Sequence, residues 1–145
     1  MREWLITNGI GGYASSTDIG GMNTRRYHGL LIASLNPPAQ RQLILSKVDE
    51  SIEIHGVNYN IFTNSTSNSV TEGYTFLQEF EKEIIPIYKF QILDTKIEKS
   101  ICMLHGKNAV IVQYRIQSQN SKSKFRVTPL LNNRDFHSLK KDQNF

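Results

Sequence analysis

Hydrophobic and polar residues alternate along several segments of this chain, as they do in strands that bury one face. In residues 87–93, with the sequence IYKFQIL, Tyr88, Phe90 and Ile92 alternate with Lys89 and Gln91, and residues 109–117, AVIVQYRIQ, alternate over most of their length. The segments 74–81 and 124–131 show the same alternation less regularly. We predict a β-strand in each of these four segments.

Turn-forming residues separate the predicted strands. HGVN at 55–58 and HGKN at 105–108 each place a glycine between two strand candidates, and QNSKS at 119–123 forms a polar link. Strands spaced this regularly are typical of a β-sandwich. Because no segment has the apolar stripe of a long amphipathic helix, a parallel α/β fold is not expected. The pattern predicts an all-β fold, an antiparallel β-sandwich.

Three stretches lack a strand pattern. They are the glycine-rich beginning of the chain up to residue 29, the polar segment 64–73 (NSTSNSVTEG) and the C-terminal segment 132–145. We predict loops there, and loops on a rigid scaffold are where binding residues usually lie.

The composition is that of an ordinary globular protein. Of the 145 residues, 39% are hydrophobic and 21% are charged, which suits one domain with a substantial core. No apolar run approaches the roughly 18 residues that cross a bilayer, and the first residues lack the apolar region of a signal peptide. Cys102 is the single cysteine, so no internal disulfide can form. We expect a cytoplasmic protein without a membrane partner.

The charge is unevenly distributed along the chain. Residues 1–81 carry five Lys and Arg against eight Asp and Glu, a net charge of −3, whereas residues 82–145 carry twelve against five, a net charge of +7. A basic half can bind nucleic acid, with a steep dependence on salt. Many of its lysines, however, occur singly and mostly alternate with apolar residues, as on the solvated face of a sheet, so we expect no nucleic-acid partner. Examples are Lys89, Lys96, Lys99, Lys107, Lys122 and Lys124.

The glycine-rich segment 8–12, NGIGG, follows a strand-like start and could be a phosphate-binding loop. Such a loop is followed by a helix whose N-terminus faces the phosphate, whereas the next residues, YASSTDIGG, have no helical stripe. The Gly-Lys-Ser/Thr sequence of a P-loop is also missing. We therefore predict no nucleotide site and expect the glycines to shape a sharp corner.

Two further segments, NTRRYHGLL at 23–31 and NNRDFHS at 132–138, combine arginine, aromatic residues and histidine. Arginine presents a planar fork to carboxylates or hydroxyl groups, and an aromatic face can stack on a sugar ring. Histidine beside aspartate can act as a general base, but no nucleophile or further zinc ligand accompanies it. The residues alone leave ligand binding and internal Arg–acid pairing both open, and they predict no metal and no cofactor.

Four segments together resemble a known family. They are EWLITNGIGGYASST at 3–17, NTRRYHGLLIA at 23–33, PPAQRQLILSKVDE at 37–50 and PLLNNRDFHS at 129–138. Their order is that of the N-terminal domain of the glycogen debranching enzymes of bacteria and archaea. The resemblance implies a supersandwich-like β-sandwich that precedes an (α/α) barrel with amylo-α-1,6-glucosidase activity, and it assigns the hydrolytic carboxylates to the barrel.

The resemblance also implies an organisation and a role. We expect residues 1–145 to form a single sandwich domain, incomplete at its C-terminal side, without the barrel and inactive alone. Its expected role is to support the barrel and to contribute to α-glucan binding in glycogen breakdown. A stand-alone carbohydrate-binding or protein-interaction module is the alternative, and it would need an exposed row of aromatic residues. Open sheet edges would also allow pairing with a second copy.

The resemblance places the candidate site in the irregular segments. We expect these to meet at one end of the sandwich, facing the glucan or the barrel, with 25–28 entering a neighbouring strand and Asp135 pairing with an arginine. Either Tyr13 or Tyr27 would stack on glucose. The candidate residues are Asn8, Gly9, Gly11, Gly12, Tyr13, Arg25, Arg26, Tyr27, His28, Arg134, Asp135 and His137.

Overall fold

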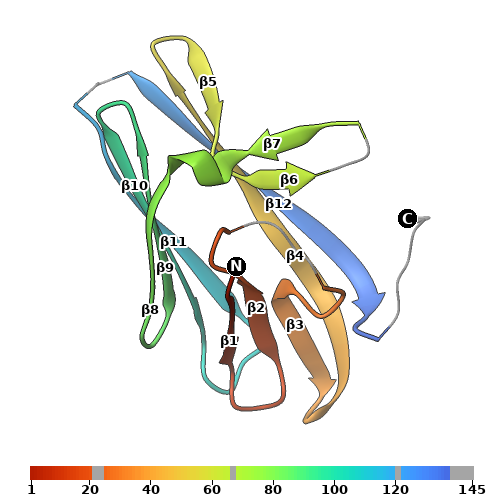
Figure 1. Ribbon diagram of the computed structural model, residues 1–145. Helices are drawn as coiled ribbons and strands as arrows, with labels where there is room; N and C mark the ends of the chain where they lie inside the picture. Colours follow the sequence, from red (N-terminus) through yellow and green to blue (C-terminus); the bar gives the residue numbers. More distant parts are fainter. Residues whose placement is uncertain (21–24, 66–67, 120–121, 138–145) are drawn as a thin grey trace.

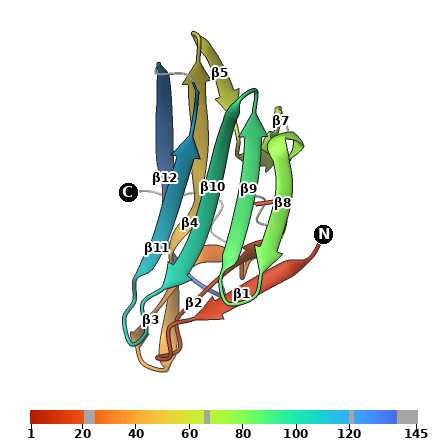
Figure 2. The ribbon, with the colours of Figure 1, turned by 90° about the vertical axis from the view of Figure 1, so that its left-hand side faces the viewer.

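Two large antiparallel sheets make up most of the protein in a computed structural model, which describes residues 1–20, 25–65, 68–119 and 122–137. The predicted antiparallel β-sandwich is confirmed, and the two layers are seen in Figures 1 and 2. The first sheet contains β1 (Glu3–Thr7), β2 (Tyr13–Thr17), β3 (Gly29–Asn36), β4 (Ala39–Ile54), β5 (Val57–Asn60) and β12 (Ser123–Asp135). The second contains β8 (Leu77–Lys82), β9 (Pro86–Ile92), β10 (Thr95–Met103) and β11 (Val110–Gln117).

The longest strand, β4, organises the first sheet. It has 16 residues and pairs with β12 along most of its length. On its other side, β3 pairs with the first half of β4 and β5 with the second half. A small hairpin of β6 (Thr63–Ser65) and β7 (Val70–Glu72) follows β5, and the 3-10 turn η1 (Gly73–Phe76) leads into β8 of the second sheet.

The core lies between the sheets, and the sequence alternation identifies much of it. In β9, Tyr88, Phe90 and Ile92 are buried, as the pattern predicts. In β11 the predicted inward face is only half-buried, and Ile116 remains 37% exposed. The difference follows from position, because β11 is an edge strand of its sheet whereas β9 has a partner on each side.

Three predicted loops contain strands. Residues 13–17 form β2, residues 132–135 belong to β12, and the segment 64–73 contains most of the β6–β7 hairpin. In β2 the small residues from Ala14 to Thr17 are all buried, so no polar face remains to produce an alternation. Residues 132–135 extend β12 because β4 still offers a partner there, across two irregularities in the register. Pairing, rather than local sequence, makes these strands.

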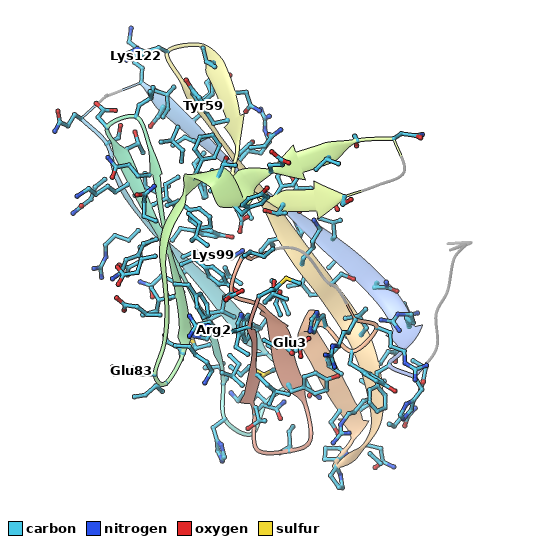
Figure 3. The ribbon with its side chains drawn as sticks, viewed as in Figure 1. Arg2, Glu3, Tyr59, Glu83, Lys99 and Lys122 are labelled. Atoms are coloured by element: carbon cyan, nitrogen blue, oxygen red, sulfur yellow. The ribbon has the colours of Figure 1, made fainter. Side chains whose placement is uncertain are left out.

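Lys99 corrects the expectation that the lysines of the basic half lie on a solvated face. Its side chain points from β10 into the space between the sheets (Figure 3) and is 8% exposed. Lys99 Nζ lies 2.5 Å from Glu50 Oε1 of β4, and the hydroxyl of Tyr114 in β11 donates to the same oxygen at 2.6 Å. A buried charge requires such a partner, so this cluster ties the two sheets together across the core.

No helix in the described ranges is long and apolar enough to cross a membrane. The single-domain organisation and the pairing of open edges with a second copy stay predictions.

Candidate functional site

The glycine-rich segment 8–12 forms a corner between β1 and β2 around the fully buried side chain of Asn8. Asn8 Oδ1 accepts the backbone N–H groups of Ile10 and Gly12 at 3.1 and 2.9 Å. Gly9 and Gly11 have φ values of +82° and +99°, which side chains rarely allow. Asn8 therefore acts as the centre of a tight turn, with its side-chain oxygen turned inward.

Hydrogen bonds connect the same corner to the turn between β10 and β11 in the other sheet. Asn8 Nδ2 donates to the carbonyl of Lys107 at 3.0 Å, and Gly106 N–H donates to the carbonyl of Asn8 at 2.6 Å. Beside it, the Asn108 amide accepts from the backbone N–H of Ser34 at 2.9 Å and donates to its carbonyl at 2.7 Å. The sequence analysis missed Asn108, although it lies in the HGKN turn.

The structure brings several candidate residues together in a second group next to this corner. The Tyr13 hydroxyl donates to the carbonyl of Tyr27 at 3.0 Å. Arg134 Nη2 donates to the carbonyl of Arg26 at 2.7 Å, and Arg26 Nη1 donates to the carbonyl of His137 at 3.1 Å. The end of β12 therefore contacts the turn that precedes β3, although about 110 residues separate them in the chain.

Two residues that the sequence analysis did not select complete this group. Arg41, at the start of β4, donates from Nε to the carbonyl of Gly11 at 2.7 Å, and its guanidinium lies 5.4 Å from the ring centre of Phe136. The Phe136 and Tyr27 rings are 5.6 Å apart. We call the group the basic–aromatic cluster: Tyr13, Arg26, Tyr27, Arg41, Arg134, Phe136 and His137. Both missed residues lie inside segments that carried the family resemblance.

The side chains of the cluster differ in their exposure to solvent. Arg134 is 6% exposed, whereas Arg26 and His137 are exposed. Burial raises the pKa of Tyr13, and the positive charge of Arg41 opposes this effect. The Tyr13 hydroxyl therefore stays protonated at neutral pH and keeps donating its hydrogen bond.

Arg25 and His28 point to a different place. Arg25 Nε pairs with Glu3 Oε1 of β1 at 2.7 Å, and His28 Nε2 lies 3.6 Å from the same oxygen. Burial lowers the pKa of His28, while Glu3 partly opposes that shift. Residues 25–28 lie in a turn before β3 rather than in the strand, which begins at Gly29. The adjacent arginines thus serve separate contacts.

Asp135 lies beside the basic–aromatic cluster. Its Oδ1 accepts the backbone N–H of His137 at 2.9 Å and so shapes the turn after β12. Its pairing with an arginine stays a prediction. Across the described parts of the chain, no three His, Cys, Asp or Glu side chains lie close enough to hold a metal ion.

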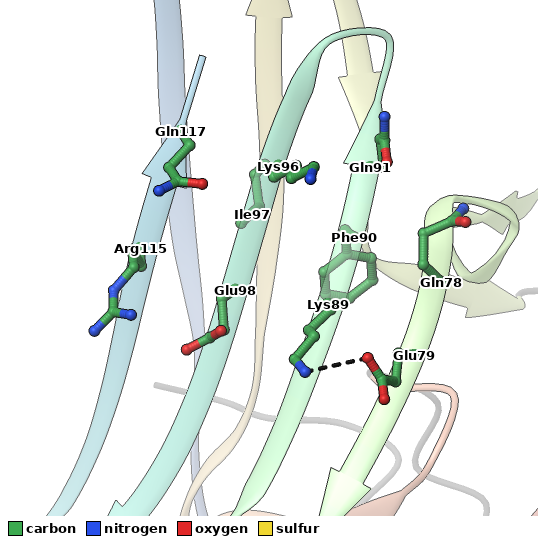
Figure 4. A pocket seen from close by; sticks show the side chains of 10 residues that line it. All are labelled: Gln78, Glu79, Lys89, Phe90, Gln91, Lys96, Ile97, Glu98, Arg115 and Gln117. Carbon is green, nitrogen blue, oxygen red and sulfur yellow. Dashed lines mark hydrogen bonds and ion pairs between the residues drawn. The ribbon is translucent and has the colours of Figure 1, made fainter.

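The outer face of the second sheet offers a separate surface, a groove of about 300 Å³ (Figure 4). Lys89 Nζ pairs there with Glu79 Oε2 at 3.1 Å and with Glu81 Oε1 at 2.5 Å. Glu98 and Arg115 add one charge of each sign to the lining. This face therefore has mixed charge, unlike the uniformly basic surface that nucleic acid would require.

Comparison with models of known protein families gives a match. The family model described as "Glycogen debranching enzyme N terminal" matches residues 2–145. Neither the curated proteins nor the solved structures gave a match.

Proposed function

We propose that this chain, which belongs to the family of glycogen debranching enzyme N-terminal domains, is a non-catalytic domain. In this proposal it supports the catalytic barrel of a debranching enzyme and contributes to α-glucan binding. The basic–aromatic cluster is the part of the domain that performs both tasks.

The observation that carries the proposal is the convergence of three distant segments on this cluster. Gly11 and Tyr13 come from the first segment of the resemblance, Tyr27 from the second and Phe136 from the last. Pairing of β4 with β12 places the last segment next to the first two. A binding site assembled from loops on a rigid sheet is the usual arrangement in such scaffolds.

The chemistry of the cluster favours binding over hydrolysis. Hydrolysis of a glycosidic bond requires two carboxyl groups on opposite sides of the bond. Among the contacts that we describe at the cluster, Asp135 supplies one carboxylate. Elsewhere, Glu50 is held by Lys99 in the core, and Glu3 pairs with Arg25. Aromatic faces and guanidinium N–H groups can instead contact sugar rings and hydroxyl groups.

The test uses a full-length debranching enzyme that carries this domain, assayed on a branched glucan. We expect Tyr27→Ala to lower kcat/KM by roughly tenfold, because the loss of one aromatic contact at a binding surface costs about 1–2 kcal/mol. Tyr74→Ala removes an exposed tyrosine from η1 and is the matched control. Arg134→Ala should lower both stability and activity, since it removes a buried contact to Arg26.

Unchanged activity and stability in both Tyr27→Ala and Arg134→Ala would contradict the proposal. Titration of the 145-residue chain with malto-oligosaccharides measures glucan binding separately from support of the barrel. We expect weak binding, because the barrel would supply the opposite wall of the cleft. Tight binding by the chain alone would favour the stand-alone carbohydrate-binding module.

A further inference from the structure

Two positive charges of the basic–aromatic cluster have no carboxylate partner among the residues that the structure describes. Neither Arg26 nor Arg41 forms an ion pair with another described residue, whereas Arg25 pairs with Glu3 at 2.7 Å. The contrast between the adjacent Arg25 and Arg26 is clear, because the first turns to an acid of β1 and the second to the end of β12.

The geometry holds these two guanidinium groups in place without neutralising them. Arg26 Nη1 donates to the carbonyl of His137, and Arg41 Nε donates to the carbonyl of Gly11. Each guanidinium has five N–H donors, so each fork keeps further N–H groups for another molecule. Arg26 also lies 4.8 Å from the ring centre of Tyr27, which restrains its side chain.

The surface around them has the composition of a protein interface. Tyrosine, phenylalanine and arginine are enriched where proteins meet, and tyrosine and arginine dominate the residues that carry binding energy. Arg26 and Arg41 line neither the groove of Figure 4 nor four further cavities of the described residues. Because small ligands bind in concave pockets, an open cluster of this kind suits a protein surface better.

We propose that the basic–aromatic cluster docks onto an acidic segment of another protein domain, whose Asp or Glu carboxylates pair with Arg26 and Arg41. The inference rests on the docking part of the proposed function and adds the chemistry of the surface that is docked onto. A neutral glucan leaves both guanidinium charges unbalanced, whereas carboxylates match their charge and their planar fork.

The experiment titrates the 145-residue chain with an oligo-glutamate peptide by calorimetry, at low and at high salt. We expect binding at low salt that weakens as salt screens the charges. The variant R26Q/R41Q should raise Kd about tenfold, because it removes both guanidinium charges that would pair with the glutamate carboxylates. The control K89Q/R115Q removes two positive charges from the outer face of the second sheet and should keep the Kd of the parent chain.

Several results would overturn the inference. These are absence of binding, an equal loss in both double variants, or equally tight binding of inorganic phosphate or of an oligothymidylate at matched conditions. Arg26→Gln alone alters an exposed side chain, so it provides the test if the double variant does not fold. Titration of the same variants with malto-oligosaccharide reports on glucan binding separately, so failure of one proposal is distinguishable from failure of the other.

Discussion

Lys99 and Arg26 carry the same charge in opposite surroundings of one sandwich. Lys99 lies in the core, where it pairs with Glu50 of the other sheet, and Glu50 also accepts a hydrogen bond from Tyr114. Arg26 is exposed at the end of the first sheet, where the carbonyl of His137 and the ring of Tyr27 hold it. The charge of Lys99 is paired because an unpaired charge in the core is costly. The charge of Arg26 can remain without a carboxylate partner because water solvates it.

The contrast between Lys99 and Arg26 predicts that breaking the buried ion pair causes the largest loss of stability. We expect Glu50→Ala to lower the free energy of unfolding by about 3–5 kcal/mol, because Lys99 then remains buried without a counter-charge. Chemical denaturation measures this loss. Lys89→Ala breaks the exposed pairs with Glu79 and Glu81 and should leave the free energy of unfolding nearly unchanged. Equal losses in the two variants would refute the contrast between interior and surface charge.

A buried polar residue at the same end as the exposed arginines sharpens the comparison. Asn8→Ala removes the acceptor of two backbone N–H groups and a donor to Lys107, so we expect a loss of about 2–3 kcal/mol. Thermal unfolding measures the change. Asn58→Ala, which removes an exposed hydrogen bond to Asn60 in β5, is the control. A near-neutral Asn8→Ala would mean that the corner does not depend on its central side chain.

The smallest effect concerns alkaline pH and the core tyrosines. Burial raises the pKa of Tyr88 and of Tyr114, and Glu50 adds to the shift of Tyr114. Above about pH 10 the unfolded chain loses tyrosine protons that the folded chain keeps. The free energy of unfolding should therefore fall as pH rises, by up to about 1.4 kcal/mol per pH unit for each tyrosine.

Denaturation between pH 9 and about pH 11 tests this slope. Tyr88→Phe and Tyr114→Phe should each make it shallower, whatever their stability at neutral pH. Tyr74→Phe alters an exposed tyrosine and is the control. A slope unchanged in both core variants would contradict the assignment of the pH dependence to Tyr88 and Tyr114.

The arrangement of the candidate site was predictable only in part. The sequence selected Tyr13, Arg26 and Tyr27, and the geometry joins them in one cluster. It did not select Arg41, because an arginine in a strand of ordinary appearance has no local signal of its role. Nor did it separate Arg25 from Arg26, since neighbouring residues in a turn can point to different partners.

The sequence by itself determined the all-β class, the inward faces of strands such as β9, and the family to which the chain belongs. These follow from local alternation and from ordered motifs, which need no knowledge of distant neighbours. Tertiary structure alone decided that Lys99 is buried, that residues 13–17 and 132–135 are strands, and that Arg41 meets Phe136. Each depends on a partner far away in the chain, since pairing energy and burial arise only when the sheets assemble.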